Sequence, residues 1–138
     1  MPTEADRIYA AGLFDGEGTV GLSNYVRFSY PTVSLASTTR GLIDFMKDTF
    51  GGTICSKRKY KKKHSPSWHW HLDWQRAIVF LTEIVPYMKE PEKVRRANLL
   101  IHGYTAVTPR NGRYTPEQVI AKRDFERRFF RPGCSITA

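Results

Sequence analysis

Residues 10–18, AAGLFDGEG, constrain the fold of this chain more than any other stretch. Small and apolar residues give way within one turn to two acids, Asp15 and Glu17, which stand between glycines. Thr3 can cap a helix before this stretch, and from Gly18 onward the pattern changes to the alternation of a β-strand. The stretch therefore predicts a helix that passes directly into a strand.

The two acids are poorly placed for an isolated helix. A helix C-terminus carries partial negative charge, so each acid is repelled there by about 0.3–1 kcal/mol. Carboxylate oxygens at such a helix end suit Mg²⁺, which binds one or two carboxylates together with phosphate and water. The alternative is that Asp15 and Glu17 are ordinary turn residues beside glycine.

One face of the predicted helix is almost bare of side chains. Ile8, Ala11, Gly12 and Asp15 fall on this face, and its small residues let another backbone come very close. Two such helices side by side would bring their C-terminal acids together, where like charges raise each other's pKa unless a cation intervenes. A divalent metal between two paired helix ends is therefore one interpretation of the pattern, beside that of ordinary turn residues.

The remaining chain alternates pairs of strands with helices, and Pro31 must lie at a strand edge or a bulge. Apolar spacing and turn residues predict strands over 18–23 and 28–36, a helix over 37–50, strands over 53–61 and 67–74, and helices over 75–85, 91–104 and 115–131. The expected fold is α+β, an αββαββα core with extra C-terminal helices in a single domain, residues 1–138. Helices would cover one face of its antiparallel sheet, and the open face would carry most of the basic residues.

Charge indicates the class of partner. Lys and Arg total 22 against 13 acids, a net charge of +9 that suits a polyanion. Six of the 22 lie in KRKYKKKH, residues 57–64, which is not part of the amphipathic helix that a membrane surface would favour. The alternative is a basic protein whose charges are merely solvated. With no bilayer-spanning run and no signal-peptide pattern, we expect an intracellular protein with no membrane partner and with reduced Cys55 and Cys134.

The stretch AAGLFDGEG resembles the nine-residue signature of the LAGLIDADG homing endonucleases. It matches the signature at Ala11, Gly12, Leu13, Asp15 and Gly18, changes conservatively at Phe14 and Glu17, and has Ala10 in place of the usual leucine. WHLDWQRA, residues 70–77, and PYMKEPEKVRRANLL, residues 86–100, are similar to later segments of the family. The resemblance covers about residues 7–104 and leaves out the final helix, residues 115–131.

The resemblance implies an intron-encoded homing endonuclease that makes metal-dependent double-strand breaks in a long, near-palindromic DNA site. A single signature implies a homodimer formed through residues 1–17, with Ile8, Ala11, Gly12 and Asp15 at the interface. Mg²⁺ or Mn²⁺ is the expected cofactor, and the open face of a saddle-like sheet is expected to bind double-stranded DNA. The alternative within this fold is a non-cleaving binder, either an RNA-splicing maturase or a DNA-binding regulator, so RNA is a further candidate partner.

The signature also implies roles for single residues. Glu17, at its eighth position, is implied to supply the metal-binding carboxylate, with Gly16 beside it at the metal site. Lys93 falls where the family keeps a basic residue near the scissile phosphate, and Ser37 falls near a polar residue that orders water. Asp15 is expected to hold the helix end through hydrogen bonds.

Base recognition is expected from the outward side chains of the sheet, because an antiparallel ribbon fits the major groove. Alternation makes Trp68, Trp70 and Leu72 core-facing, and it places Thr32 and Ser34 opposite to Val33 and Leu35. Arg58 is the expected guanine contact. The predicted DNA-binding residues are Arg58, Ser56, Tyr60, Lys62, Thr32, Ser34, His69 and His71. The arginines of the helices and the C-terminus, Arg95, Arg96, Arg127, Arg128 and Arg131, are expected to contact phosphate or water. A zinc site at His69 and His71 is the weaker alternative, because the histidines lack paired ligand spacing.

Overall fold

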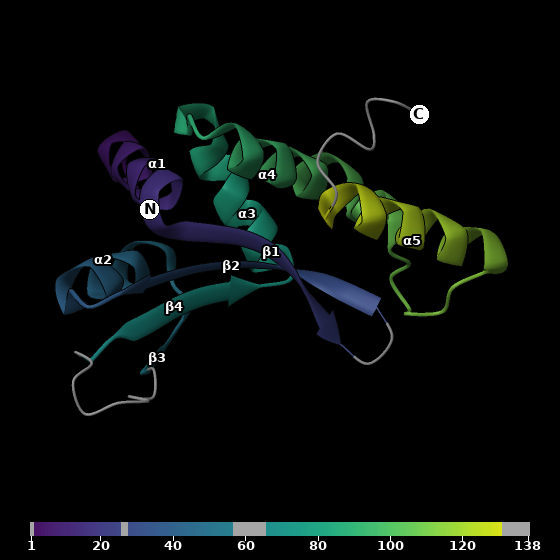
Figure 1. Ribbon diagram of the computed structural model, residues 1–138, viewed down its shortest axis with the longest axis horizontal. Coiled ribbons are helices and arrows are strands. Elements are labelled where there is room, and N and C mark those ends of the chain that lie inside the picture. Colours follow the sequence, from purple (N-terminus) through teal and green to yellow (C-terminus); the bar gives the residue numbers. More distant parts are fainter. Residues whose placement is uncertain (1, 26–27, 57–65, 131–138) are drawn as a thin grey trace.

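The computed structural model describes residues 2–25, 28–56 and 66–130 (Figure 1). The helices and strands are α1 (Glu4–Glu17), β1 (Gly18–Tyr25), β2 (Phe28–Ser37), α2 (Arg40–Phe50), β3 (Thr53–Ser56), β4 (Trp68–Asp73), α3 (Gln75–Ile84), α4 (Pro91–Gly103) and α5 (Pro116–Phe130). Two short 3₁₀ helices, η1 (Val85–Tyr87) and η2 (Thr105–Val107), flank α4. The predicted α+β order is confirmed. Among the described helices, none has the length and apolarity that crossing a bilayer requires.

The four strands form one antiparallel sheet in the order β1-β2-β4-β3. Helices α1, α3 and α4 lie over one face of the sheet, and α2 packs beside β4 and β2 (Figure 1). No helix of the described chain lies on the opposite face, which we call the open face. The predicted arrangement of helices on one side and an open sheet surface on the other is therefore confirmed.

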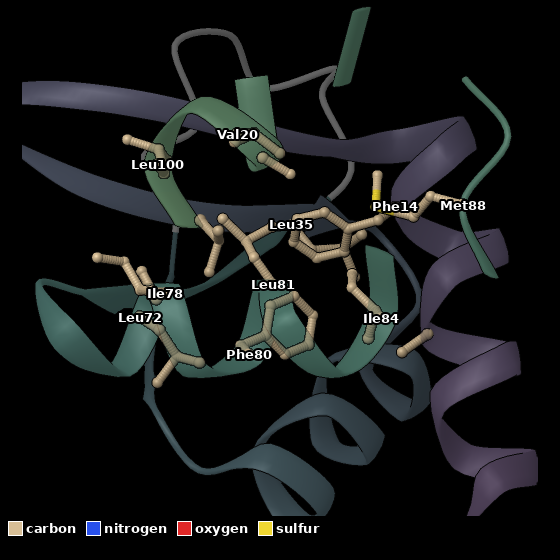
Figure 2. Close-up of a cluster of buried hydrophobic side chains, with 14 of the residues drawn as sticks. Phe14, Val20, Leu35, Leu72, Ile78, Phe80, Leu81, Ile84, Met88 and Leu100 are labelled. Carbon is tan, nitrogen blue, oxygen red and sulfur yellow. The ribbon is translucent and has the colours of Figure 1, made fainter. Parts of the chain in front are cut away.

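Alternation along the strands builds the core. Val33 and Leu35 on β2, and Trp70 and Leu72 on β4, are all at most 3% exposed. Each fully buried side chain of this size contributes about 1.5–3 kcal/mol. Figure 2 shows the sheet residues Val20 and Leu35 in one cluster with Phe14 from α1, Leu100 from α4 and several side chains from α3. The predicted core-facing parity of β2 and β4 is confirmed.

Pro31 lies in β2, which is a central strand, yet its position is compatible with proline. The last pair between β2 and β4 is Thr32 with Asp73, so β4 has ended where Pro31 begins. The carbonyl of Pro31 accepts a hydrogen bond from the N–H of Trp74 at 2.9 Å. Proline has no backbone N–H, and at position 31 no residue of β4 is paired that would accept a hydrogen bond from one. On its β4 side, Pro31 is therefore in the situation of a residue on an edge strand, where proline is tolerated.

Helix α5, outside the region of resemblance, is capped at its start by its own residues and bonded to α4 at its end. Thr115 and Gln118 form a capping box at its start, with hydrogen bonds of 2.8 and 3.2 Å. At its end, Arg95 donates to the backbone carbonyls of Arg128 and Phe129, both at 2.9 Å. These bonds satisfy terminal groups that a helix cannot pair internally.

A lysine is fully buried in α5. Lys122 is 0% exposed, donates to Oγ1 of Thr108 at 2.6 Å and lies 4.1 Å from the ring centroid of Tyr104. Burial lowers the pKa of Lys122 from 10.5 to about 8, although the Glu126 carboxylate acts in the opposite direction. The folded chain therefore releases this proton more readily than the unfolded chain does.

This shift predicts a stability that depends on pH. Between pH 8 and 10 the unfolded chain binds a proton that folded Lys122 has lost, so the free energy of unfolding should rise by about 2 kcal/mol. Burial raises the pKa of Tyr104, so its opposite effect begins only above about pH 10. Urea denaturation at one protein concentration should show this rise in the wild type and its absence in Lys122→Met. An equal slope in both proteins would contradict it.

Candidate active site at the end of α1

Helix α1 turns into β1 with no intervening loop. The N–H of Gly18 donates to the carbonyl of Phe14, and Gly18 is itself buried. A Cβ atom at Gly18 would lie 2.4 Å from the Phe14 ring and 2.8 Å from its Cα atom. Only glycine can therefore occupy this ninth position of the signature while Phe14 fills the core.

Asp15 is held by hydrogen bonds from the segment that begins α4. Its carboxylate accepts hydrogen bonds from the N–H of Lys89, at 2.9 and 3.1 Å, and from the N–H of Glu90, at 3.1 Å. These groups precede α4, and a helix N-terminus carries partial positive charge that favours an acid. The predicted role of Asp15 in hydrogen bonding is confirmed.

Lys93 reaches the same helix end from α4. Its ammonium group donates to the backbone carbonyls of Phe14, at 2.8 Å, and of Asp15, at 3.0 Å. Its backbone N–H donates to the Glu90 side chain at 2.6 Å. The cation thus compensates the negative end of α1, and Asp15, whose carbonyl it contacts, lies two residues before Glu17 in the chain. Lys93 therefore contacts the helix end that carries Glu17, while the roles that the family resemblance implies for the two residues stay predictions.

Glu17 and Gly16 are exposed at this helix end. Unlike Asp15, whose carboxylate is held by α4, Glu17 presents its carboxylate at the surface. A carboxylate oxygen is a suitable ligand for Mg²⁺ or Mn²⁺, but one carboxylate is an incomplete set. Within the described residues, no group of three or more His, Cys, Asp or Glu side chains could hold a metal. A metal here would need further ligands from phosphate, water or a second chain.

Substituting Asp15 should weaken the fold. Asp15→Asn keeps the size of the side chain but replaces charge-assisted bonds to two backbone N–H groups, so the free energy of unfolding should fall by about 1–2 kcal/mol. Asp44→Asn is the matched control, because Asp44 only pairs with Arg40 in an exposed bridge on α2. Chemical denaturation of the two variants compares them directly. Equal, small losses in both would show that the contact to α4 contributes nothing.

Ser37 ends β2, near the turn from α1 into β1. Leu35 pairs with Gly18, so the last residues of β2 lie at the same end of the sheet as Glu17. The Ser37 hydroxyl accepts a hydrogen bond from the N–H of Thr39 at 2.9 Å. It therefore orders the turn that precedes α2, and its role with water stays a prediction.

The exposed side of α1 differs in part from the predicted face. It consists of the residues Ala5, Ile8, Tyr9, Gly12 and Gly16, which we call the α1 stripe. Ile8 and Tyr9 are about half exposed, and a Cβ atom at Gly12 or Gly16 would meet nothing within 4 Å. Spacings of three and four residues connect the whole stripe, so the helical period could have added Ala5 and Tyr9, which the sequence reading did not assign to it.

Two residues expected at the dimer interface are corrected by the structure. Ala11 is 0% exposed within its own chain and has no surface to offer a second one. The carboxylate of Asp15 is turned to the start of α4 by its bonds to Lys89 and Glu90. Ile8 and Gly12, by contrast, lie on the exposed stripe.

The open face carries small and polar side chains in rows across the strands. Strand register places Thr19, Ser34, His71 and Thr53 in one row. Thr32 lies in the next row, opposite Asp73, and His69 stacks on His71 with ring centroids 5.5 Å apart. The predicted outward positions of Thr32, Ser34, His69 and His71 are confirmed, while their contacts with bases stay predictions.

The distribution of charge on the open face differs from the prediction. Within the described strands, the outward positions of the sheet hold no Lys or Arg. Fourteen of the 22 basic residues lie elsewhere in the described chain. Several of these arginines bind their own chain: Arg95 caps α5, Arg96 donates to the Val20 carbonyl, and Arg127 pairs with Asp124. The expectation that most basic residues line the open face is wrong.

Ser56 also differs from the prediction. It pairs with Trp68, so by register its side chain lies on the helix side of the sheet, in a hollow lined by Arg40 and Lys47 of α2. It does not belong to the open face. The predicted contacts Arg58, Tyr60 and Lys62, together with Arg131, lie outside the described residues.

No family model matches the sequence, and no curated protein matches it. Solved structures share its architecture. The homing endonuclease I-CvuI, in complex with its target in the presence of calcium, has a TM-score of 0.72 at 13% identity, over 92% of this chain and 81% of that chain. The archaeal intron-encoded homing endonuclease I-Vdi141I, complexed with DNA, has a TM-score of 0.61 at 15% identity, over 92% and 83% of the two chains. The LAGLIDADG homing endonuclease I-GzeII, in complex with a DNA target, has a TM-score of 0.62 at 13% identity, over 86% of this chain and 42% of that chain.

These likenesses define an α+β protein with an open antiparallel sheet and a signature helix that ends beside it. That fold is the fold of the LAGLIDADG homing endonucleases.

Proposed function

We propose that two copies of this chain form a sequence-specific endonuclease that cuts both strands of a long, near-palindromic DNA site with Mg²⁺ or Mn²⁺. One observation carries the proposal. The end of α1 is fixed by bonds to α4, yet it leaves Glu17 exposed beside the bare Gly12 and Gly16. The likeness to structures of homing endonucleases bound to DNA supports the same reading.

The α1 stripe supports pairing of two chains. Residues without side chains let helix backbones pack closely, and the flanking Ile8 and Tyr9 offer apolar surface to a partner. Pairing along this stripe would bring two copies of Glu17 to the same place and supply the second carboxylate. The chain spans 81% of I-CvuI but 42% of I-GzeII, so the I-GzeII chain is long enough to hold two such units.

The residues at the helix end have complementary roles in the proposal. Glu17, with Gly16 beside it, holds the divalent ion. When bound, such an ion stabilises the charge that develops on a phosphodiester during hydrolysis. Lys93, which neutralises the carbonyls of Phe14 and Asp15, adds positive charge at the same point. Ser37 orders water at the adjacent end of β2.

The open face supplies recognition in the proposal. Thr32, Ser34, His69 and His71 present donors and acceptors that match base edges in the major groove. These side chains are uncharged or titratable, so affinity for phosphate comes from basic residues elsewhere, including residues 57–64. Phosphate contacts position a protein on DNA, while base contacts specify the sequence.

A randomised duplex library, bound by the protein and then supplied with Mg²⁺, tests the function. We expect cuts on both strands at a near-palindromic consensus, and affinity that falls steeply with salt. A consensus that is enriched but never cut would assign the chain to non-cleaving binders, either a maturase or a regulator. Weak, salt-insensitive binding would reject nucleic acid as the partner.

A further inference from the structure

A cavity opens where β2 runs past the end of β4. Its volume is about 980 Å³, at the upper end of the range for small-molecule sites, roughly 300–1,000 Å³. Three segments form its walls: the start of β2, the junction of β4 and α3, and the loop of residues 104–114. In Figure 1 this end of the sheet lies below α5, far from the labelled α1. The cavity is therefore separate from the candidate active site.

Aromatic side chains make up much of the wall. Phe28, Trp74, Tyr104 and Tyr114 all line the cavity. The rings of Phe28 and Tyr114 stack with centroids 4.0 Å apart, and the Trp74 indole, which is 46% exposed, stacks on Tyr30. A flat exposed ring such as the Trp74 indole accepts the face of a nucleobase regardless of sequence.

The backbone of Trp74 is strained in a way that positions the indole. Its φ of 58° lies in the region that favours glycine, and within the described residues it is the one non-glycine residue with positive φ. The hydrogen bond from its N–H to the Pro31 carbonyl helps to hold this conformation. Strained residues of this kind concentrate at binding and active sites.

The charge of the cavity favours an anion. Arg110 lines it together with Asn111, and its described lining holds no Asp or Glu. The buried ammonium of Lys122 lies directly behind the wall, bonded to Thr108. The Glu126 carboxylate, which acts on Tyr104 and Tyr114 of the wall, accepts bonds from Ser29 and from Arg123. A flat ring that carries a phosphate matches both the aromatic walls and this positive charge.

We propose that this cavity binds one unpaired nucleotide of the DNA whose duplex lies on the open face. The base packs against Trp74, Arg110 pairs with the phosphate, and Asn111 bonds the base edge. Asp73, which immediately precedes Trp74, has its side chain on the open face, so the cavity borders the surface proposed for the duplex. The inference rests on the proposed function for its source of DNA, although the site can be tested with a mononucleotide alone.

The first experiment measures binding of deoxyadenosine monophosphate by saturation-transfer NMR. We expect saturable binding in the wild type and a loss of at least fivefold in Trp74→Gly, which removes the ring while suiting the positive φ. Arg110→Ala should weaken binding about tenfold. Arg113→Ala is the matched control, because this arginine is in the same loop but does not line the cavity. It should bind as the wild type does.

Deoxyadenosine and inorganic phosphate, titrated separately, should each bind more weakly than the nucleotide. Absence of saturable nucleotide binding, or equal binding by all three variants, would overturn the site. Binding of blunt duplex DNA, measured on the same preparations, tests the proposed function independently. If the wild type binds duplex DNA but not the nucleotide, the proposed nucleotide site is refuted and the proposed function stands. If it binds the nucleotide but not duplex DNA, the proposed function is refuted and the nucleotide site stands.

The second experiment links the site to DNA. A duplex with one unpaired terminal nucleotide should bind the wild type about fivefold more tightly than the blunt duplex does, because one base stacks in the cavity. Trp74→Gly should abolish this difference without changing affinity for the blunt duplex, while Trp74→Phe should keep most of it. An equal preference in wild type and Trp74→Gly would show that the unpaired nucleotide binds elsewhere.

Discussion

Cleavage of duplex DNA should be lost in Glu17→Gln while DNA binding persists. Glutamine keeps the shape of the side chain but removes the charge that binds a divalent ion. We expect the cleavage rate to fall at least about a thousandfold, because several kcal/mol of transition-state stabilisation depend on that ion. Glu17 is exposed, so the variant should fold and bind DNA as the wild type does. Single-turnover cleavage and a gel-shift titration measure the two properties.

Two further variants make this result specific. Glu4→Gln removes an exposed acid from the first turn of the same helix and should leave cleavage unchanged. Glu17→Asp restores the residue usual at this position of the signature and should recover part of the activity. If Glu17→Gln lost binding and cleavage together, Glu17 would be structural. Cleavage at the wild-type rate would exclude it from the reaction.

Gly12→Leu should convert the proposed dimer into folded monomers that do not make the proposed double-strand breaks. A Cβ atom at Gly12 meets nothing within 4 Å in its own chain, so leucine fits the monomer. Leucine also favours the helix by up to about 1 kcal/mol relative to glycine. The same side chain would prevent two α1 helices from packing closely. Light scattering should therefore report half the wild-type mass with an unchanged circular dichroism spectrum.

The α2 helix offers a matched control for this substitution. Gly41 is also exposed on a helix, and a Cβ atom there likewise meets nothing within 4 Å. Gly41→Leu should remain dimeric and active. A dimeric Gly12→Leu protein that cuts both strands would place the interface somewhere other than the α1 stripe. An unfolded Gly12→Leu monomer would contradict the open space around this residue.

The sequence predicts most of the fold because its local signals agree with one another. Periodicity, the Thr115 capping box and the glycines that follow α2 mark the elements, and parity assigns the faces of β2 and β4 correctly. The orientation of α1 is harder to predict from the sequence. The helical period shows which residues share a face of the helix, but not whether that face packs on the core or is exposed. Ala11 belongs to the core because Phe14 and the sheet pack on that side, which is a tertiary fact.

The candidate site is predictable only where a residue acts locally. The role of Asp15 follows from its place at a helix end, but its partners, Lys89 and Glu90, are more than seventy residues away. The prediction of where the arginines lie was wrong for the same reason. Arg95 lies near the end of α5 only after α4 and α5 have packed together, and no spacing along the chain reveals that. The cavity at the end of β4 likewise depends on three distant segments.

The rows on the open face bear on how target preference could change during evolution. Thr19, Ser34, His71 and Thr53 are immediate cross-strand neighbours, so a larger side chain at one position moves or covers the next. Substitutions at touching sites do not add independently. A substitution that changes which base is preferred at one position of the target would therefore also change which bases are accepted at the adjacent positions. Divergent copies of such a protein would exchange whole rows together, and single-residue intermediates would recognise their sites less sharply than either parent.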